Sequence, residues 1–150
     1  MLTPKCPLCN KTGELVKGLD VYPHRTDLSK KSFYRCPEHT NVFVGCHPDT
    51  NNPMGYMATP KLRTLRSKVH KLFDPIWKEK RLESRTKAYQ WFAKEMQLPL
   101  KITHVAMFNE QQCHKAIYLL ESYHADLRQK EHEKALADKW KPSEDLTFED

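Results

Sequence analysis

Two short motifs, Cys6-Pro7-Leu8-Cys9 and Cys36-Pro37-Glu38-His39, resemble each other and lie 30 positions apart in the chain. Each half places two zinc-capable side chains three residues apart, a spacing at which a tight turn points both at one ion. Three thiolates and one imidazole satisfy tetrahedral Zn²⁺, which accepts sulfur and nitrogen without a geometric demand of its own. We therefore predict one structural zinc site formed by Cys6, Cys9, Cys36 and His39.

The fourth ligand is the least determined of the set. Cys46 and His47 carry the same ligand atoms, so either could replace His39 at the metal. An alternative for the whole set is that the cysteines are small buried residues, but paired half-sites favour the metal. Asn10 and Asn41 closely follow the two pairs, and asparagine tolerates the left-handed backbone that such turns often need.

The composition describes a short, basic chain with few hydrophobic residues. It has 150 residues, of which 39% are hydrophobic, and a net charge of +6. This length fits one domain, or two small units that share a core. A bound metal would stabilise the smaller unit. The five cysteines form no disulfide framework, and neither an apolar leader nor a membrane-spanning run is found. We expect a soluble, cytoplasmic protein without membrane contact.

Short apolar runs separated by turn residues lie between and after the two half-sites. They are Leu15-Val16, Val21-Tyr22, Phe33-Tyr34 and Val42-Phe43-Val44. Short strands with a metal at one end predict a small antiparallel zinc ribbon over residues 1–50. Residues 51–60 are crowded with turn formers and predict a connector that packs the ribbon against the C-terminal part of the chain.

The hydrophobic period changes to that of helices from Pro60 onward. Apolar residues recur at three- and four-residue steps as far as Ile76, which predicts a helix with one buried face. Pro75 is expected to break this run at Asp74. Asp74 would then cap a short helix of its own.

Two more helices complete a predicted helical module over residues 61–140. One begins after a Ser84 cap and ends before Pro99. The other opens at Asn109, and Gln112 stands where a capping-box partner belongs. The predicted fold class is therefore α+β, a small antiparallel zinc ribbon followed by three main helices.

The positive charge is concentrated in one part of the chain. Residues 61–87 carry ten Lys or Arg against three Asp or Glu, whereas residues 88–150 carry eight against eleven. This asymmetry suggests a polyanionic partner, although a lysine-rich helical face is often only solvated. The candidate nucleic-acid contacts are Lys61, Arg63, Arg66, Lys68, Lys71 and Lys78. Residues 141–150 are expected to form a loose acidic tail.

Several short motifs occur together between residues 6 and 120. They are Cys6-Pro7-Leu8-Cys9, Cys36-Pro37-Glu38-His39, Val44-Gly45-Cys46-His47-Pro48, Pro53-Met54-Gly55, Leu62-Arg63, Phe73-Asp74-Pro75-Ile76-Trp77, Ala88-Tyr89-Gln90-Trp91, and Met107-Phe108-Asn109 with Gln112-Cys113. In this combination the chain resembles an uncharacterised family of bacterial and bacteriophage proteins that join a zinc ribbon to a helical module. The resemblance implies zinc ligands at Cys6, Cys9, Cys36 and position 39, where His39 replaces the usual cysteine. It implies no established activity.

Three classes of function can be weighed from these features. The leading hypothesis is a module that contacts nucleic acid through the basic helical segment. The ribbon aromatics Tyr22, Phe33, Tyr34 and Phe43 would either stack on unpaired bases or build the ribbon core. The alternative is a protein-interaction module, such as a phage-type modulator of a host nucleic-acid-processing enzyme. An enzyme is disfavoured, because four protein ligands close the metal and no catalytic motif is present. No small-molecule substrate is expected.

Overall fold

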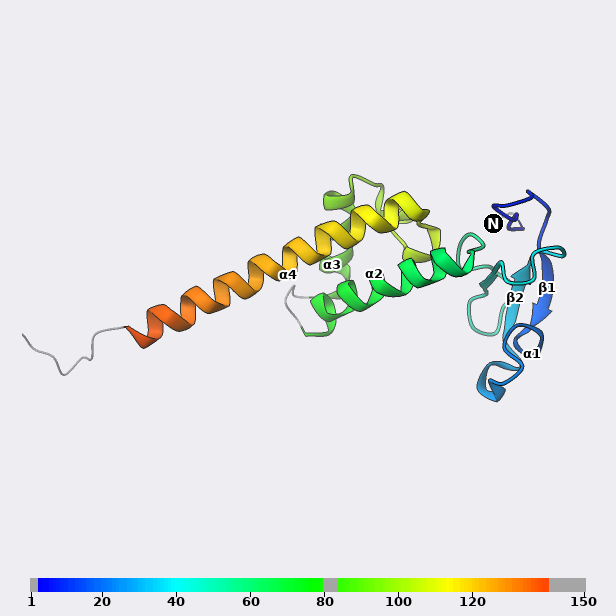
Figure 1. Cartoon of the computed structure of the whole chain (residues 1–150), viewed down its shortest axis with the longest axis horizontal. Coiled ribbons are helices and arrows are strands. Elements are labelled where there is room, and N and C mark those ends of the chain that lie inside the picture. Colours follow the sequence, from blue (N-terminus) through cyan, green and yellow to red (C-terminus); the bar gives the residue numbers. More distant parts are fainter. Residues whose placement is uncertain (1–2, 80–83, 141–150) are drawn as a thin grey trace, which may run out of the picture.

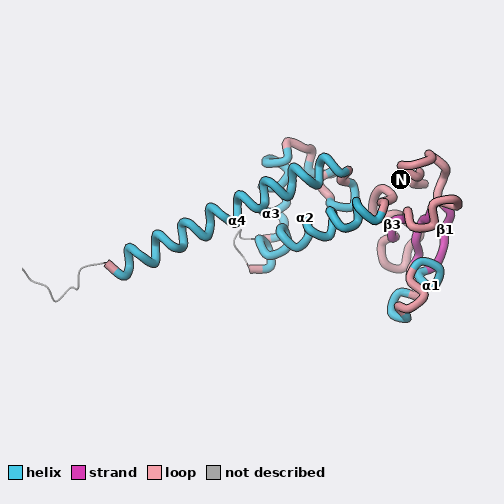
Figure 2. Tube along the Cα trace, in the orientation of Figure 1, coloured by secondary structure: helices cyan, strands magenta, loops and turns pink. Residues whose placement is uncertain are grey.

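A computed structural model describes residues 3–79 and 84–140, so the expected acidic tail at 141–150 lies outside the described residues. A small sheet occupies one end of an elongated molecule, and three long helices come after it (Figure 1). Figure 2 shows that the strands are confined to the N-terminal end, while the last helix extends beyond the other two at the opposite end. Within the described ranges, every helix is too short or too polar to cross a membrane.

The sheet is antiparallel, with the strand order β1-β2-β3, as predicted for a ribbon. The strands span Glu14–Lys17 (β1), Ser32–Arg35 (β2) and Phe43–Gly45 (β3). Tyr34 in the central strand is paired with Leu15 on one side and with Val44 on the other. The connector also joins the sheet, because Phe43 and Ala58 exchange backbone hydrogen bonds of 3.3 and 3.0 Å.

The run Val21-Tyr22 does not form the strand that its composition suggested. It ends a single helical turn, α1 (Gly18–Val21), and a 3-10 turn, η1 (Thr26–Leu28), comes next. The chain doubles back so tightly here that a Cβ on Gly18 would lie 1.6 Å from the carbonyl oxygen of Leu28. An extended strand cannot make this close approach, and the local reversal therefore overrides the β-forming residues.

The first long helix, α2 (Pro60–Lys78), runs through Pro75 instead of stopping at Asp74. A proline inside a helix removes one hydrogen bond and crowds the preceding turn, at a cost of about 3 kcal/mol. Ile76 is fully buried in the helical core, and burying such a side chain contributes about 1.5–3 kcal/mol. Packing beyond the proline thus offsets its cost. The expected break and the separate short helix are wrong.

The other two long helices are confirmed with their caps. The hydroxyl of Ser84 accepts a hydrogen bond of 3.1 Å from the N–H of Lys87. Asn109 and Gln112 form the predicted capping box, each side chain accepting from the other's backbone N–H. These helices and the two 3-10 turns between them span Arg85–Met96 (α3), Leu100–Ile102 (η2), Val105–Met107 (η3) and Glu110–Lys139 (α4).

The helical core forms where α2, α3 and α4 meet. Phe73, Phe92 and Leu120 are fully buried, and the rings of Phe73 and Phe92 stack with centroids 4.6 Å apart. Cys113 is a buried thiol in the same core. The second half of α4 leaves this core, and every residue from 128 to 140 is exposed. The helix therefore projects from the body of the molecule (Figure 1).

Candidate functional site: a metal centre and a basic helix

Two turns bring the four predicted zinc ligands together where β1 begins and β2 ends. The ligand atoms of Cys6, Cys9, Cys36 and His39 all lie within 4.8 Å of one another. The sulfurs of Cys9 and Cys36 are 3.5 Å apart, and Nδ1 of His39 lies 3.7 Å from the Cys6 sulfur and 3.6 Å from that of Cys36. Bonds of about 2.3 Å to sulfur and 2.1 Å to nitrogen give a tetrahedron with edges of roughly 3.5–3.8 Å. The donor set therefore fits zinc.

Backbone N–H groups point at the thiols of both turns. The N–H of Leu8 donates to the Cys6 sulfur at 3.4 Å, and the N–H of His39 donates to the Cys36 sulfur at 3.3 Å. Burial raises the pKa of the Cys36 thiol, but hydrogen bonds from the N–H groups of His39 and Glu38 outweigh it and lower the pKa to about 6. These turns thus favour the thiolate, which is the form that binds a metal.

The two turns differ in their backbone. Asn10 has a φ of 63°, in the left-handed region, as its position after the first cysteine pair suggested. Among the described residues, positive φ values outside glycine are found at Asn10, Asp49 and Gln97, so the second turn closes without a left-handed residue at Asn41. An exposed ion pair between Lys11 and Glu38 links the two turns across the metal site.

Cys46 and His47, the alternative fourth ligands, lie outside this cluster. Cys46 is buried, and its N–H donates to the carbonyl of Ser32 at 3.0 Å. Burial also raises the pKa of the Cys46 thiol, which disfavours the metal-binding thiolate. His47 is exposed in the turn after β3, where its N–H donates to the carbonyl of Asn52. His39 is therefore the fourth donor in this structure.

Two of the six basic residues predicted to contact nucleic acid are engaged inside the protein. Arg66 is 9% exposed, and its guanidinium donates to the carbonyls of Phe108 and Tyr56 at 2.9–3.0 Å. Its burial lowers the pKa of this guanidinium. Arg63 is half-buried, with its guanidinium 3.9 Å from the ring centroid of Phe43. Arg66 is therefore a structural residue and not a surface contact. The guanidinium of Arg63 is likewise largely engaged in contacts within the protein.

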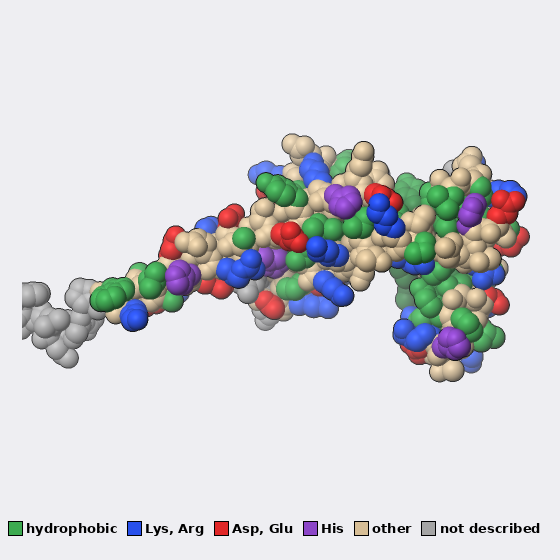
Figure 3. Space-filling model, in the orientation of Figure 1, with side chains coloured by type: hydrophobic (Ala, Val, Ile, Leu, Met, Phe, Trp, Pro, Cys, Tyr) green, Lys and Arg blue, Asp and Glu red, His purple; other side chains and the backbone are tan. Residues whose placement is uncertain are grey.

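The other four predicted contacts are exposed lysines of α2. They are Lys61, Lys68, Lys71 and Lys78, here called the lysine stripe. Steps of seven, three and seven residues place them within about 100° of the helix circumference. Lys61 and Lys68 lie 3.4 and 3.3 Å from Glu110 and Glu121 of α4, but such exposed ion pairs contribute only about 0–1 kcal/mol. Figure 3 shows Lys and Arg side chains along this part of the molecule, with Asp and Glu side chains beside some of them.

The ribbon aromatics build packing contacts instead of an open surface. Phe33 and Phe43 are buried, and Tyr22 meets both rings edge-on with centroids 5.9 and 5.5 Å away. The hydroxyl of Tyr34 donates to the carbonyl of Asn51 at 2.7 Å. This arrangement favours the ribbon-core interpretation of these residues over base stacking.

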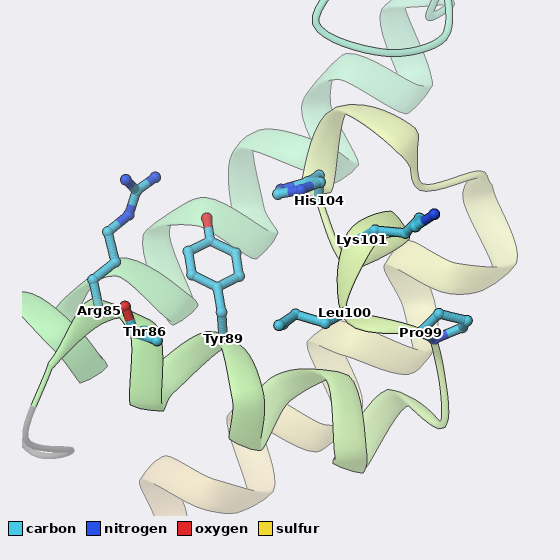
Figure 4. A pocket seen from close by; sticks show the side chains of 7 residues that line it. All are labelled: Arg85, Thr86, Tyr89, Pro99, Leu100, Lys101 and His104. Atoms are coloured by element: carbon cyan, nitrogen blue, oxygen red, sulfur yellow. The ribbon is translucent and has the colours of Figure 1, made fainter.

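One cavity was not anticipated from the sequence. It measures about 660 Å³ and lies between α3 and η2, lined by residues that include Arg85, Tyr89 and His104 (Figure 4). These side chains come from separate elements and follow no diagnostic spacing. No sequence pattern pointed to them.

Comparisons with known proteins agree with the metal site. Searches of curated proteins and of solved structures found no match. A family model described as a zinc-finger-containing domain matches residues 2–123, a range that includes all four ligands, α2 and α3. The family and the cluster of three cysteines and one histidine together indicate zinc binding. The chain belongs to the DUF3268 family of zinc-finger-containing domains.

Proposed function

We propose that this protein is a non-enzymatic module that binds nucleic acid through the lysine stripe of α2. The observation that carries the proposal is the placement of Lys61, Lys68, Lys71 and Lys78 on one exposed face of a single helix. The stripe extends over about 25 Å of the helix axis, enough to meet several phosphates of one strand. Exposed ammonium groups on a rigid helix release counterions from a phosphate backbone, which is the main source of such affinity.

A single structural Zn²⁺ supports this module in the proposal. The buried cluster of the ribbon is small and consists of Cys6, Cys36, Val42, Val44 and Met57. Such a small core does not hold a fold by itself, and metal binding would supply the missing folding free energy. Four protein ligands also fill a tetrahedral zinc, which leaves no position for a substrate or an activated water. We therefore assign the metal no catalytic role.

Binding to phosphates without base contacts predicts weak sequence preference and steep salt dependence. Each phosphate neutralised contributes a slope of roughly −0.9 in log affinity per log salt on duplex and about −0.7 on single strands. Changing all four stripe lysines to Gln should weaken binding to every sequence and flatten the slope by up to about 3.6 on duplex and about 2.8 on single strands. Fluorescence anisotropy with labelled oligonucleotides over a salt series measures both quantities.

The matched control removes the same charge elsewhere. Lys94, Lys130, Lys134 and Lys139 are exposed on α3 and α4, and changing them to Gln leaves the stripe intact. If this control weakens binding as much as the stripe variant, net charge explains the affinity and the proposed interface is wrong. Absence of binding at low salt would reject the nucleic-acid function itself.

The projecting end of α4 favours a second candidate function, contact with a protein such as a nucleic-acid-processing enzyme. Residues 128–140 are all exposed, and the side chains of Leu136 and Trp140 are 42% and 76% exposed. A helical segment of this length is only marginally stable without packing. A partner that covered its apolar residues would stabilise it.

A pull-down from native host extract, with nuclease treatment, tests this second candidate. A protein partner should survive nuclease and be lost when Leu136 and Trp140 are both changed to Ala. Tyr118→Ala is the control, because Tyr118 is 72% exposed on the same helix but next to the folded core. A partner that disappears with nuclease, or that still binds the double variant, would contradict contact through this helix end.

A further inference from the structure

The cavity of about 660 Å³ lies on the helical module, away from the metal centre and next to the start of α3. Its volume is within the range of roughly 300–1,000 Å³ that small-ligand pockets occupy. In Figure 4, Tyr89 rises from α3, and the side chains of Leu100 and His104 point toward it from the segment after this helix. The pocket is therefore open between one helix and one turn.

The walls of this pocket are aromatic and apolar. The ring of Tyr89 is held in place by an edge contact with the buried ring of Phe73, with centroids 4.9 Å apart. The imidazole of His104 lies 6.0 Å from the Tyr89 ring, tilted by 53°. Leu100 is 48% exposed and adds an apolar surface to the wall of the pocket. These surfaces fit a flat, partly apolar group.

The rim of the pocket is positively charged. The guanidinium of Arg85 lies over the Tyr89 ring at 5.3 Å from its centroid. Among the described residues that line the pocket, none is acidic, and in Figure 4 the side chain of Lys101 points away from the Tyr89 ring, which leaves Arg85 as the cation beside it. The pocket therefore suits a flat group that carries a negative charge close by, as a base carries its phosphate.

The pocket and the lysine stripe are linked by contacts of Trp77, which lies outside the pocket lining. The ammonium of Lys78, at the end of the stripe, lies 5.4 Å from the Trp77 ring, and the guanidinium of Arg85 lies at the same distance from it. One tryptophan thus joins the last stripe lysine to the first cation of the pocket. A strand that runs with the stripe along α2 passes Asp74 and Glu79 beside Lys71 and Lys78. It reaches the pocket where Lys78, Trp77 and Arg85 adjoin.

We propose that this pocket receives one unpaired base of a single-stranded nucleic acid whose phosphates run along the lysine stripe. The inference rests on the proposed nucleic-acid function and makes it specific for unpaired strands. Aromatic side chains bind bases by stacking without reading their sequence, and a cation at the ring edge assists. An acidic peptide with an aromatic side chain would suit the pocket alone, but the adjoining stripe favours a strand with regularly spaced charges.

The test compares two ligands with the same phosphates. One is a labelled oligothymidine, and the other is an abasic oligonucleotide of equal length that lacks the bases. The wild-type protein should bind the oligothymidine about fivefold to 150-fold more tightly, which is the range for stacking of one base on an aromatic side chain. Tyr89→Leu should abolish this preference, whereas Tyr89→Phe should keep it.

Tyr89 packs on the core, so Tyr89→Leu also removes contacts that stabilise the fold. A second variant therefore tests the pocket without changing Tyr89. Leu100→Asp places a negative charge at an exposed position of the pocket and should also abolish the preference for bases. Equal binding of both ligands by the wild-type protein, or a preference that survives in Leu100→Asp, would overturn the pocket assignment. Binding of an acidic aromatic peptide at the pocket without any preference for bases would overturn it as well.

Failure of this inference can be told apart from failure of the proposed function. If only the pocket is wrong, the lysine-stripe variant still weakens binding to duplex and abasic strands, and Tyr89→Leu changes nothing. If only the stripe is wrong, the stripe variant keeps its salt slope, while Tyr89→Leu still removes the preference for bases. Loss of both effects rejects both assignments.

Discussion

The guanidinium of Arg66 donates two hydrogen bonds, from Nε and Nη2, to the carbonyl oxygen of Phe108 at 3.0 and 2.9 Å. A third donor of the same group, Nη1, binds the carbonyl of Tyr56 at 2.9 Å. One buried side chain of α2 thus holds both the connector that leaves the ribbon and the turn that precedes α4. Its charge is stabilised by carbonyl dipoles.

Replacing Arg66 by Met should lower the free energy of unfolding by roughly 2–4 kcal/mol, since the buried carbonyl of Phe108 would lose its donors. Urea unfolding followed by circular dichroism measures this change. Lys68→Met on the exposed face of the same helix is the control and should change stability by less than about 0.5 kcal/mol. Equal midpoints for the two variants would contradict the role assigned to Arg66.

Removing the metal with a chelator should unfold the ribbon while the helices persist, because the helical module has a large buried core whereas the buried cluster of the ribbon is small. Circular dichroism should retain most of its helical signal after chelation. Native mass spectrometry should find one zinc ion per chain before it. A count of zero or two zinc ions would defeat the assignment.

His39→Ala should weaken zinc retention sharply, because three ligands leave the fourth position to water. Competition with a coloured chelator measures the change, and His39→Cys should restore retention. Cys46→Ala serves as the control, since Cys46 lies outside the ligand cluster. Weaker retention in Cys46→Ala or His47→Ala, with His39→Ala unaffected, would mean that the fourth ligand is misassigned.

Truncation of fully buried core residues should cost far more than truncation at the projecting helix end. Phe73→Ala and Leu120→Ala should each lower stability by about 2–5 kcal/mol, because both side chains are completely buried. Trp140→Ala, at a position 76% exposed, should change stability by less than about 0.5 kcal/mol. Thermal melts that barely move for Phe73→Ala would show that its side chain is not packed as described.

Features fixed by neighbouring residues were predictable from the sequence. The two metal turns and the caps at Ser84 and Asn109 depend on side chains within three residues, so their spacing alone identifies them. Pro75 misled the prediction because the local cost of a proline was offset by the burial of Ile76, which depends on the whole core.

Arg66 was predicted to lie on the surface because of its charge, although the helical period places it on the buried face. It lies four residues after Leu62 and seven before Phe73, so the helical period places it on the buried face together with both. Its positive charge suggested the surface, because the partner carbonyl of Phe108 lies 42 residues away and leaves no mark in the local sequence. The pocket beside Tyr89 could not be predicted for a similar reason. Its lining residues come from α3 and from the segment after it, and only the folded chain brings their side chains around one cavity.

The projecting half of α4 also fixes the direction, around the helix axis, in which the side chains at its tip point relative to the folded core. A straight helix places Trp140 about 30 Å from Leu120, and each residue adds 1.5 Å of length and about 100° of rotation. Inserting one residue after position 128 would therefore hardly change the reach of the helix but would turn its tip by more than a quarter of a circle. In any complex that contacts both ends of this chain, adding or removing a residue of α4 would change the orientation of the helix tip far more than its distance from the core.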